Sequence, residues 1–377
     1  MNSKNKPIKL RTWLEIDKKA IRNNYSVFQK IIKPETKLMA IVKSNAYGNE
    51  LIGFSKVLDE LGVDSFGVDS ITEGLALREA GIMKPILVLG YTIHENISIA
   101  SEKDISITLS SFDALSLLVQ EKIPIKVHVK IDSGMHRQGF FPKDAKKLAD
   151  ILLKQKHITV EGIYTHFANA KNPSFSGDTD KQVEEFKQAT DFFEKAGFHF
   201  IKHASATSGT MLFPKYHFDM VRIGIGLSGL WPAKEVERVL EKHISLSPVL
   251  TWKTIIAEVK TIQKGDRVGY NFTETFSKDT KIAICPIGYW HGFPRALSSV
   301  GQILVSGKRA RVLGRVSMDM ITVDINDIKD VKIGDEVILI GKQGKEEITA
   351  DEFAAYVDTS SYEIVTRINP KIQRVFT

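Results

Sequence analysis

The sequence MAIVKSNAYG, from Met39 to Gly48, decides the fold and the chemistry that this chain can support. Its apolar run predicts a buried strand, which ends at Lys43 and is followed by a polar Ser-Asn turn. α/β barrels place their active sites at the carboxyl ends of such strands. A partly desolvated lysine there can act as a base or as a nucleophile, for example by forming a Schiff base with pyridoxal phosphate. The hydroxyl of Tyr47 could reach a phosphate group.

A strand-then-helix rhythm surrounds this stretch and continues to about residue 224. Alternating strands and helices predict parallel βαβ units, and eight of them predict a closed (β/α)8 TIM barrel. An open doubly wound sheet is the alternative, but no Gly-x-Gly-x-x-Gly motif follows an early strand. The predicted strands are Leu38–Val42, Ser65–Val68, Ile86–Leu89, Ile105–Leu109, Ile125–Ile131, Val160–Tyr164, Phe198–Lys202 and Val221–Gly224.

The rhythm changes after about residue 231. Short strands separated by turn signals predict a mainly antiparallel β domain, with strands at Lys253–Ile262, Lys281–Ile287, Gln302–Val305, Ala310–Gly314, Met320–Asp324 and Glu336–Ile340. We therefore expect a barrel domain over residues 12–240 and a β domain made of residues 1–11 and 241–377. The alternating strand at Trp13–Asp17 is included in the barrel range, although it could pair with the β domain instead.

Composition narrows the possible functions. The chain has 377 residues, 43% of them hydrophobic, and its net charge of +7 is spread along the chain. Without a basic stripe or a known module, a nucleic-acid partner is not expected. The single cysteine, Cys285, predicts a buried thiol. The first residues lack the apolar core of a signal peptide, and no run of 18 apolar residues occurs, so a cytoplasmic protein without a membrane span is expected.

The segment VKSNAYG, Val42–Gly48, resembles the cofactor-lysine motif VKANAYG of alanine racemases, which are fold-type III pyridoxal 5′-phosphate enzymes. The resemblance implies that Lys43 forms the Schiff base and that Tyr47 contacts the cofactor phosphate. The segment MVRIGIGLSG is similar to the family's MVRxGIxLYG. It implies that Arg222 faces the pyridine nitrogen and that the backbone amides of Gly224 and Ile225 bind the phosphate.

Other motifs of the barrel domain carry the same resemblance. HASATSG, His203–Gly209, is close to the family's HxANSA, so Thr207 takes the place of a phosphate-binding serine, while Ala206 departs from the family's asparagine. His166 in GIYTHFANA would lie near the cofactor ring and contact Arg222. KIDSGMHRQG resembles KxDTGMxRxG, which implies that Arg137 supports the substrate carboxylate and that Lys130 is the lysine that is often carbamylated. From the residues alone, Asp-Ser-Gly could equally be an ordinary turn.

The β domain supplies the remaining motifs. Tyr270 in RVGYNF matches the family's catalytic tyrosine, and a tyrosine acts as a base at neutral pH only beside a cation. GRVSMDM is similar to GRxCMDQ and implies that Met318 and Asp319 lie at the substrate carboxylate. In the family these residues reach the cofactor of the other subunit, which implies a homodimer. SYEIVT resembles NYEVxC and implies that Tyr362 returns to the phosphate.

The largest departure is PIGYWHGFPR, where the family has PIGYADGxxR. Tyr289, at the entrance of the family's site, is kept, whereas Trp290 and His291 replace a small and an acidic residue. These larger side chains could change access or substrate choice, or could pack at the dimer surface; packing is the favoured interpretation.

The sequence therefore predicts a pyridoxal-phosphate alanine racemase that interconverts L- and D-alanine and supplies D-alanine for peptidoglycan. Lys43 and Tyr270 would carry protons on opposite faces of the substrate carbon. One alternative is a broad-specificity or serine racemase on the same fold. A decarboxylase of this fold is disfavoured, because it would want an acidic residue in place of Arg222. A non-catalytic pyridoxal-phosphate-binding protein is a third alternative, but it would not need the β domain or Tyr270.

Overall fold

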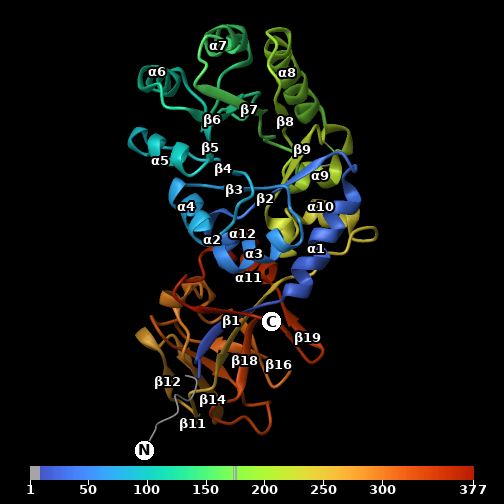
Figure 1. Cartoon of the computed structure of the whole chain (residues 1–377). Coiled ribbons are helices and arrows are strands. Elements are labelled where there is room, and N and C mark those ends of the chain that lie inside the picture. The colour runs from blue at the N-terminus through green and yellow to red at the C-terminus, as the bar shows by residue number, and fades with distance from the viewer. Residues whose placement is uncertain (1–8, 173, 175) are drawn as a thin grey trace, which may run out of the picture. The chain divides into compact units, whose positions relative to one another are not determined.

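The computed structural model describes residues 9–172, 174 and 176–377, and the chain divides into two compact units (Figure 1). One unit is Lys19–Ser247; the other combines the chain up to Lys18 with Pro248–Thr377. This division differs from the expected barrel range of 12–240. The strand β1 (Thr12–Ile16) belongs to the second unit, because it pairs with residues 250–254 and 373–376 of that unit and buries Leu14 and Ile16 there.

The first unit is a closed parallel barrel, as predicted. Its strands follow one another around the barrel in chain order, and each lies within a few residues of its predicted position. They are β2 (Lys37–Ile41), β3 (Ser65–Val68), β4 (Ile86–Val88), β5 (Ile105–Leu109), β6 (Ile125–Lys130), β7 (Ile158–Tyr164), β8 (Ile201–His203) and β9 (Met220–Ile223).

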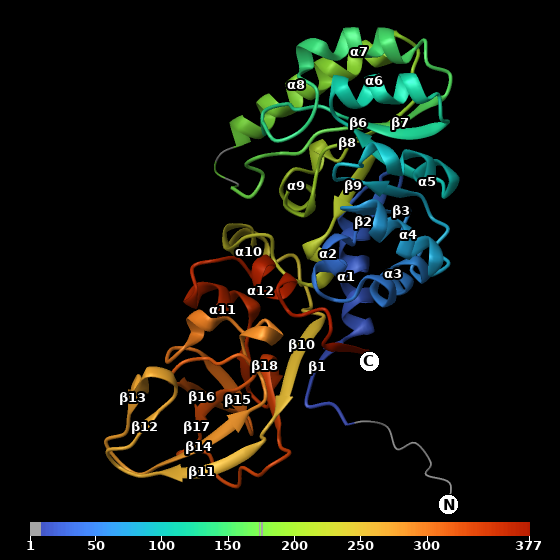
Figure 2. The same ribbon diagram turned by 90° about the vertical axis from the view of Figure 1, so that its left-hand side faces the viewer.

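Helices follow the barrel strands, and α6 and α7 lie outside β6 and β7 (Figure 2). The helices of this part of the chain are α1 (Lys18–Ile31), α2 (Lys43–Tyr47), α3 (Leu51–Glu60), α4 (Ile71–Glu79), α5 (Ile97–Glu102), α6 (Phe112–Glu121), α7 (Ala145–Leu152), α8 (Ser176–Lys195), α9 (Thr207–Leu212) and α10 (Lys234–Leu240). Strands covered by helices outside and by packed side chains inside are buried on both faces, which explains why every residue of β3 and β5 is buried.

The barrel strands carry two different groups of buried side chains. Met39, Ile41, Leu87 and Met220 form an apolar cluster there. A second group of buried side chains is polar or charged, and its members come from β5 to β9: Thr108, His128, Tyr164, His203 and Arg222. A core of this kind is costly unless every polar group is hydrogen-bonded, so its presence points to a function.

The second unit is a mainly antiparallel β domain, as predicted. Its main sheet has the order β11-β14-β17-β16-β15-β18-β10-β1-β20, with β19 beside β18. Besides β1, its strands are β10 (Leu250–Ile255), β11 (Glu258–Ile262), β14 (Thr280–Cys285), β15 (Gln302–Val305), β16 (Lys308–Leu313), β17 (Ile321–Asp324), β18 (Glu336–Gln343), β19 (Glu346–Ile348) and β20 (Gln373–Phe376). The pair β12 (Arg267–Val268) and β13 (Glu274–Thr275) forms a small hairpin, and the helices are α11 (Ala350–Tyr356) and α12 (Ser361–Thr366).

One strand prediction in this unit is wrong. Residues 253–262 form two strands, because the chain leaves β18 and β1 after Ile255 and then pairs with β14. The Ile256 and Ala257 amides bond to Asp335 and Ile284 carbonyls, so the change of partner costs no backbone hydrogen bond. No glycine or proline lies at this break, so the sequence pattern did not predict it. Cys285 is fully buried, as predicted.

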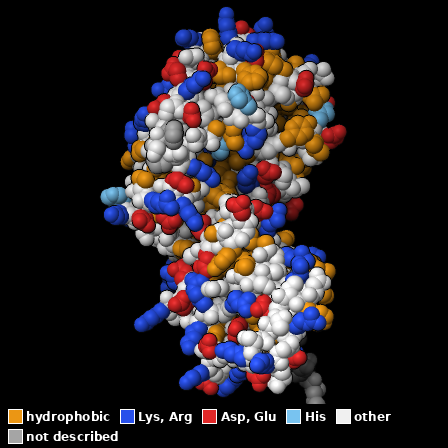
Figure 3. All heavy atoms as spheres, turned by 180° about the vertical axis from the view of Figure 1, so that it is seen from behind, with side chains coloured by type: hydrophobic (Ala, Val, Ile, Leu, Met, Phe, Trp, Pro, Cys, Tyr) orange, Lys and Arg blue, Asp and Glu red, His pale blue; other side chains and the backbone are white. Residues whose placement is uncertain are grey.

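Basic and acidic side chains are mixed over the face of the molecule in Figure 3. Among the described residues, no helix combines the length and the apolar character that a membrane crossing requires.

Candidate active site

Lys43 follows β2 directly and opens an unusual turn. Ser44, Asn45, Ala46 and Tyr47 all have left-handed backbone angles, with φ between 51° and 57°. Each such residue costs about 1–2 kcal/mol when it is not glycine, so the surrounding structure must hold the turn. The Lys43 side chain is 38% exposed, and its Nζ lies 3.4 Å from Asp69 Oδ1 at the end of the neighbouring strand β3. The predicted strand-end position of Lys43 is therefore confirmed.

Three residues predicted to bind phosphate come together on neighbouring elements. Tyr47 packs so closely on Gly224 that a Cβ at this glycine would lie 2.3 Å from the Tyr47 hydroxyl. The hydroxyl of Thr207, at the start of α9, accepts the Gly224 amide at 3.3 Å. Burial raises the pKa of Tyr47 to about 12, so its hydroxyl stays protonated and can donate. Two hydroxyls and the backbone amides at Gly224 and Ile225 make a donor set that fits a phosphate group.

Arg222 on β9 is buried and firmly held. Its Nη2 donates to the carbonyls of Thr165 and Ala204 at 2.9 and 2.8 Å and contacts His166 Nδ1 at 3.2 Å. Its guanidinium lies 5.2 Å from the centre of the Tyr164 ring, a cation–π contact. Burial lowers the pKa of Arg222 only to about 10, so it remains a cation at neutral pH. A surface ion pair, the ordinary explanation for a lone arginine, is excluded.

The network continues from Arg222 through two buried histidines. Arg222 Nη1 donates to His203 Nδ1 at 2.9 Å. Because arginine only donates, His203 carries its proton on Nε2, which therefore donates to His128 Nδ1 at 2.9 Å. Burial, and next the Arg222 charge, lower the pKa of His128 to about 3 and that of His203 well below its ordinary value. Both rings are neutral, and Gly162 makes room for His128, since a Cβ there would lie 2.2 Å from Nδ1.

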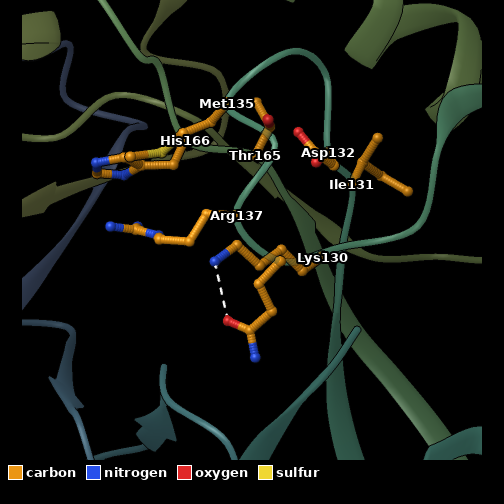
Figure 4. A pocket seen from close by; sticks show the side chains of 8 residues that line it. Lys130, Ile131, Asp132, Met135, Arg137, Thr165 and His166 are labelled. Carbon is orange, nitrogen blue, oxygen red and sulfur yellow. Dashed lines mark hydrogen bonds between the residues drawn. The ribbon is translucent and has the colours of Figure 1, made fainter. Parts of the chain in front are cut away.

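Two other basic residues of the predicted site, Lys130 and Arg137, line a pocket beside this network. The pocket is lined by residues of the segments Lys130–Gln138 and Thr165–His166. Figure 4 shows Arg137 alongside His166, with the Lys130 ammonium below it. Lys130 Nζ donates to Gln138 Oε1 at 3.2 Å. Burial, then Arg137 and Arg222, lower the pKa of Lys130 to about 8, and burial and Arg222 lower that of His166 to about 3.

Asp132 has a structural part in the same pocket. Its Oδ1 accepts the amides of Gly134 and His136 at 3.2 and 2.8 Å. These bonds close the loop that carries Arg137. The alternative interpretation of Asp-Ser-Gly as a turn is therefore correct for Asp132.

The β domain brings some of its predicted residues close together in space. Tyr289 and Trp290 donate their amides to the carbonyls of Ser317 and Met318, both at 3.0 Å, which places Tyr289 beside Met318 and Asp319. Tyr270 is 68% exposed in the turn after β12, and the preceding glycine contacts Arg315 of the same loop. Tyr362 lies on α12. How these residues meet the barrel unit, and the site roles assigned to them, stay predictions.

Trp290 and His291, which depart from the family motif, lie in different environments. His291 is buried, and its Nδ1 accepts the Gly288 amide at 3.2 Å. Burial lowers the pKa of His291, so it serves as a neutral acceptor that shapes the turn around Tyr289. Trp290 keeps 47% of its surface exposed and packs edge-on against His291. Packing accounts for His291, whereas Trp290 stays available at the surface.

Both units match family models. Residues 16–232 match the alanine racemase N-terminal domain, and residues 249–376 match the alanine racemase C-terminal domain. The chain belongs to the alanine racemase family. The alanine racemase of Halothermothrix orenii is 39% identical over 99% of this chain and 98% of its own length. That of Methanococcus maripaludis is 38% identical over 97% and 98%, respectively.

Solved alanine racemases share the fold. The enzyme of Clostridium difficile superposes with a TM-score of 0.92 and 33% identity, covering 98% of this chain and 96% of that one. The enzyme of Bacillus anthracis, solved with bound L-Ala-P, gives a TM-score of 0.93 and 34% identity over 99% and 96%. Membership in the alanine racemase family makes this chain a racemase, and so an isomerase.

Several residues of the site were not identified from the sequence. His128 looked like one polar position in a strand, and Tyr164 like a core aromatic. Glu73 and Asp69, which contact the Lys43 turn, were also missed. The only local signal for Glu73 was the pattern Ser70-x-x-Glu73, which is typical of a helix capping box.

Proposed function

We propose that this chain is an alanine racemase that uses pyridoxal 5′-phosphate and interconverts L-alanine and D-alanine. The observation that carries the proposal is the buried Arg222 on β9, the strand paired with the one that leads to Lys43. A cation that can only donate, set against a pyridine nitrogen, favours the unprotonated ring and a weaker electron sink. A weaker sink favours return of the proton over side reactions, which suits racemisation. The names of the relatives support alanine as the substrate.

The residues present fit this cofactor. Lys43 would hold it covalently, and the hydroxyls of Tyr47 and Thr207 would bind its phosphate together with the amides of Gly224 and Ile225. Arg222 and His166 would face the ring, and Tyr362 would return to the phosphate from the β domain. When bound, the cofactor supplies the electron sink that makes the substrate α-proton acidic.

Proton transfer then falls to the chain's own side chains. Lys43 Nζ and the Tyr270 hydroxyl would act from opposite faces of the substrate carbon, one removing the proton and the other returning it. Arg137, with Met318 and Asp319, would hold the substrate carboxylate. The bond between Arg222 and His166 holds the guanidinium and the imidazole against one another on the barrel side of the proposed site.

A substrate panel tests this function. With pyridoxal 5′-phosphate added, we expect the purified protein to racemise L-alanine at least ~10-fold faster than L-serine or L-lysine, the discrimination that a tight apolar contact provides. Chiral chromatography of the products measures all three rates. A preference for serine would establish the alternative racemase, for which the exposed Trp290 beside Tyr289 is the supporting observation. Cofactor binding without any turnover would establish the carrier alternative.

Lys130 is expected to carry a carbamate. Carbon dioxide reacts only with a neutral amine, and a pKa of about 8 leaves roughly a tenth of Lys130 neutral at pH 7, far more than for an ordinary lysine. The carbamate would place a negative charge beside Arg137. In ¹³C-bicarbonate we expect an NMR carbamate signal that grows from pH 6 to 8 and is absent in Lys130→Arg. An unchanged spectrum in that variant would assign the signal to another amine.

The assembly and the cellular role complete the proposal. Apolar side chains of the β domain that are left exposed support a homodimer with shared sites: Tyr270, Phe272, Tyr289, Trp290, Met318 and Met320. Light scattering should then give the mass of two chains. A supply of D-alanine for peptidoglycan predicts rescue of a bacterium that cannot make D-alanine. The cytoplasmic location stays a prediction.

A further inference from the structure

Glu73, in the first turn of α4, contacts the strained turn after Lys43. Its Oε1 accepts the Ser44 amide at 2.7 Å and the Asn45 amide at 3.4 Å. Its Oε2 accepts the Asp69 amide at 2.8 Å. One carboxylate therefore bridges the ends of β2 and β3, and it accepts the amides of the residues that follow each strand.

An ordinary capping role does not describe these contacts. Ser70 caps α4, and its hydroxyl accepts the Glu73 amide at 3.4 Å. In a capping box the Glu73 carboxylate would return to the Ser70 amide. Here the carboxylate bonds instead to Asp69, one residue earlier, and to the Lys43 turn. The start of α4 is therefore capped by Ser70 alone, and the Glu73 carboxylate bonds to the Lys43 turn instead.

Asp69 connects this carboxylate to the Lys43 ammonium. The Asp69 side chain lies 3.4 Å from Lys43 Nζ, while its carbonyl accepts the Gly90 amide at 3.1 Å. Gly90 must lack a side chain, since a Cβ there would lie 2.3 Å from the Asp69 carbonyl oxygen. Glu73 therefore holds the backbone of Asp69 and of the residues that directly follow Lys43.

We propose that Glu73 is a positioning residue for Lys43, which holds the left-handed turn and the Asp69 backbone so that the Lys43 amine is presented for covalent attachment of the cofactor. The inference rests on the proposed role of Lys43. Without the carboxylate, the Ser44 and Asp69 amides lose their shared acceptor, and the strained turn relaxes toward ordinary backbone angles.

Four variants of the full chain test this role. Glu73→Ala removes the acceptor, and Glu73→Gln keeps one acceptor oxygen without the charge. Ser70→Ala removes the helix cap alone, and Glu79→Gln changes an exposed acid of the same helix. Pyridoxal 5′-phosphate is added to each apoprotein, attachment is followed by absorbance, and the adduct is fixed with borohydride and located by peptide mass spectrometry. Hydrogen exchange reports on the Ser44 and Asp69 amides.

We expect attachment to Lys43 to slow at least about tenfold in Glu73→Ala, the effect of ~1.4 kcal/mol on a barrier, with part of the label moving to other lysines. Glu73→Gln should be intermediate, and both control variants should stay within about twofold of the wild type. Exchange of the Ser44 and Asp69 amides should accelerate in the Glu73 variants alone.

Two results would overturn the inference: Glu73 variants that attach the cofactor at the wild-type rate and place, or a Ser70→Ala variant that slows attachment equally. If Glu73→Ala does not fold, Glu73→Gln decides between these outcomes. A wild-type protein that never attaches the cofactor at Lys43 would instead refute the proposed function, and hydrogen exchange at Ser44 and Asp69 would still test the hold of Glu73 on the turn.

Discussion

Replacing Lys43 with alanine is expected to reduce racemisation of L-alanine by at least about 10⁴-fold. The variant loses both the covalent anchor of the cofactor and one of the two proton carriers, and a positioned base alone contributes 10²–10⁴-fold. Chiral chromatography gives the rate, and borohydride reduction followed by mass spectrometry shows whether the cofactor is still attached.

Lys37→Ala is the matched control for this prediction. Lys37 lies at the opposite end of the same strand, β2, and is exposed, so its loss should change the rate by less than about twofold. Lys43→Ala with more than about a hundredth of the wild-type rate would contradict the assignment of Lys43 as anchor and base.

Tyr270→Phe should lower racemisation by about 10²–10⁴-fold and leave cofactor attachment intact. The change removes only a hydroxyl from an exposed turn of the β domain, so the fold should be unaffected. If two bases work on opposite faces, Lys43 alone still serves one face. We therefore expect exchange of the α-proton with deuterated water from one alanine enantiomer only, without inversion, measured by proton NMR.

Two further measurements accompany the Tyr270→Phe experiment: a control variant, and a test of whether the two bases of one site come from different subunits. Tyr356→Phe, at another partly exposed tyrosine of the same unit, should behave as the wild type. If the two bases of one site come from different subunits, unfolding and refolding Lys43→Ala together with Tyr270→Phe should restore activity, because a mixed dimer contains one intact site. Exchange from both enantiomers in Tyr270→Phe would show that the second base is a different residue.

The barrel could be predicted from the sequence because its strands are short apolar runs between helical segments, and burial on both faces requires that composition. The break at Ile256 could not, because the backbone bonds there are taken over by new partners without a turn residue. The expected barrel range of 12–240 also differs from the structure, because β1 joins the β domain by pairing with residues more than two hundred positions away.

Some residues of the candidate site could likewise be predicted from the sequence, and others could not. The motifs around Lys43, Arg222, Arg137 and Tyr270 are local in sequence, and the resemblance assigned them. The buried chain from Arg222 through His203 to His128 joins three strands, and no spacing in the sequence shows that these side chains meet. The burial of His291 could not be predicted either, because the sequence does not distinguish a buried histidine that accepts a hydrogen bond from an exposed one.

By itself, the sequence determined the strand order of the barrel, the class of the second domain and the residue types available for chemistry, since these follow from local composition and period. Only the tertiary structure decided which of these residues share one hydrogen-bond network, and hence their protonation states. His128 and His203 stay neutral because burial and the Arg222 charge both lower their pKa values, whereas Arg222 stays a cation because burial lowers its pKa only to about 10. Glu73 reaches the Lys43 turn only in the folded chain, because the closed barrel places the end of β2 beside the start of α4.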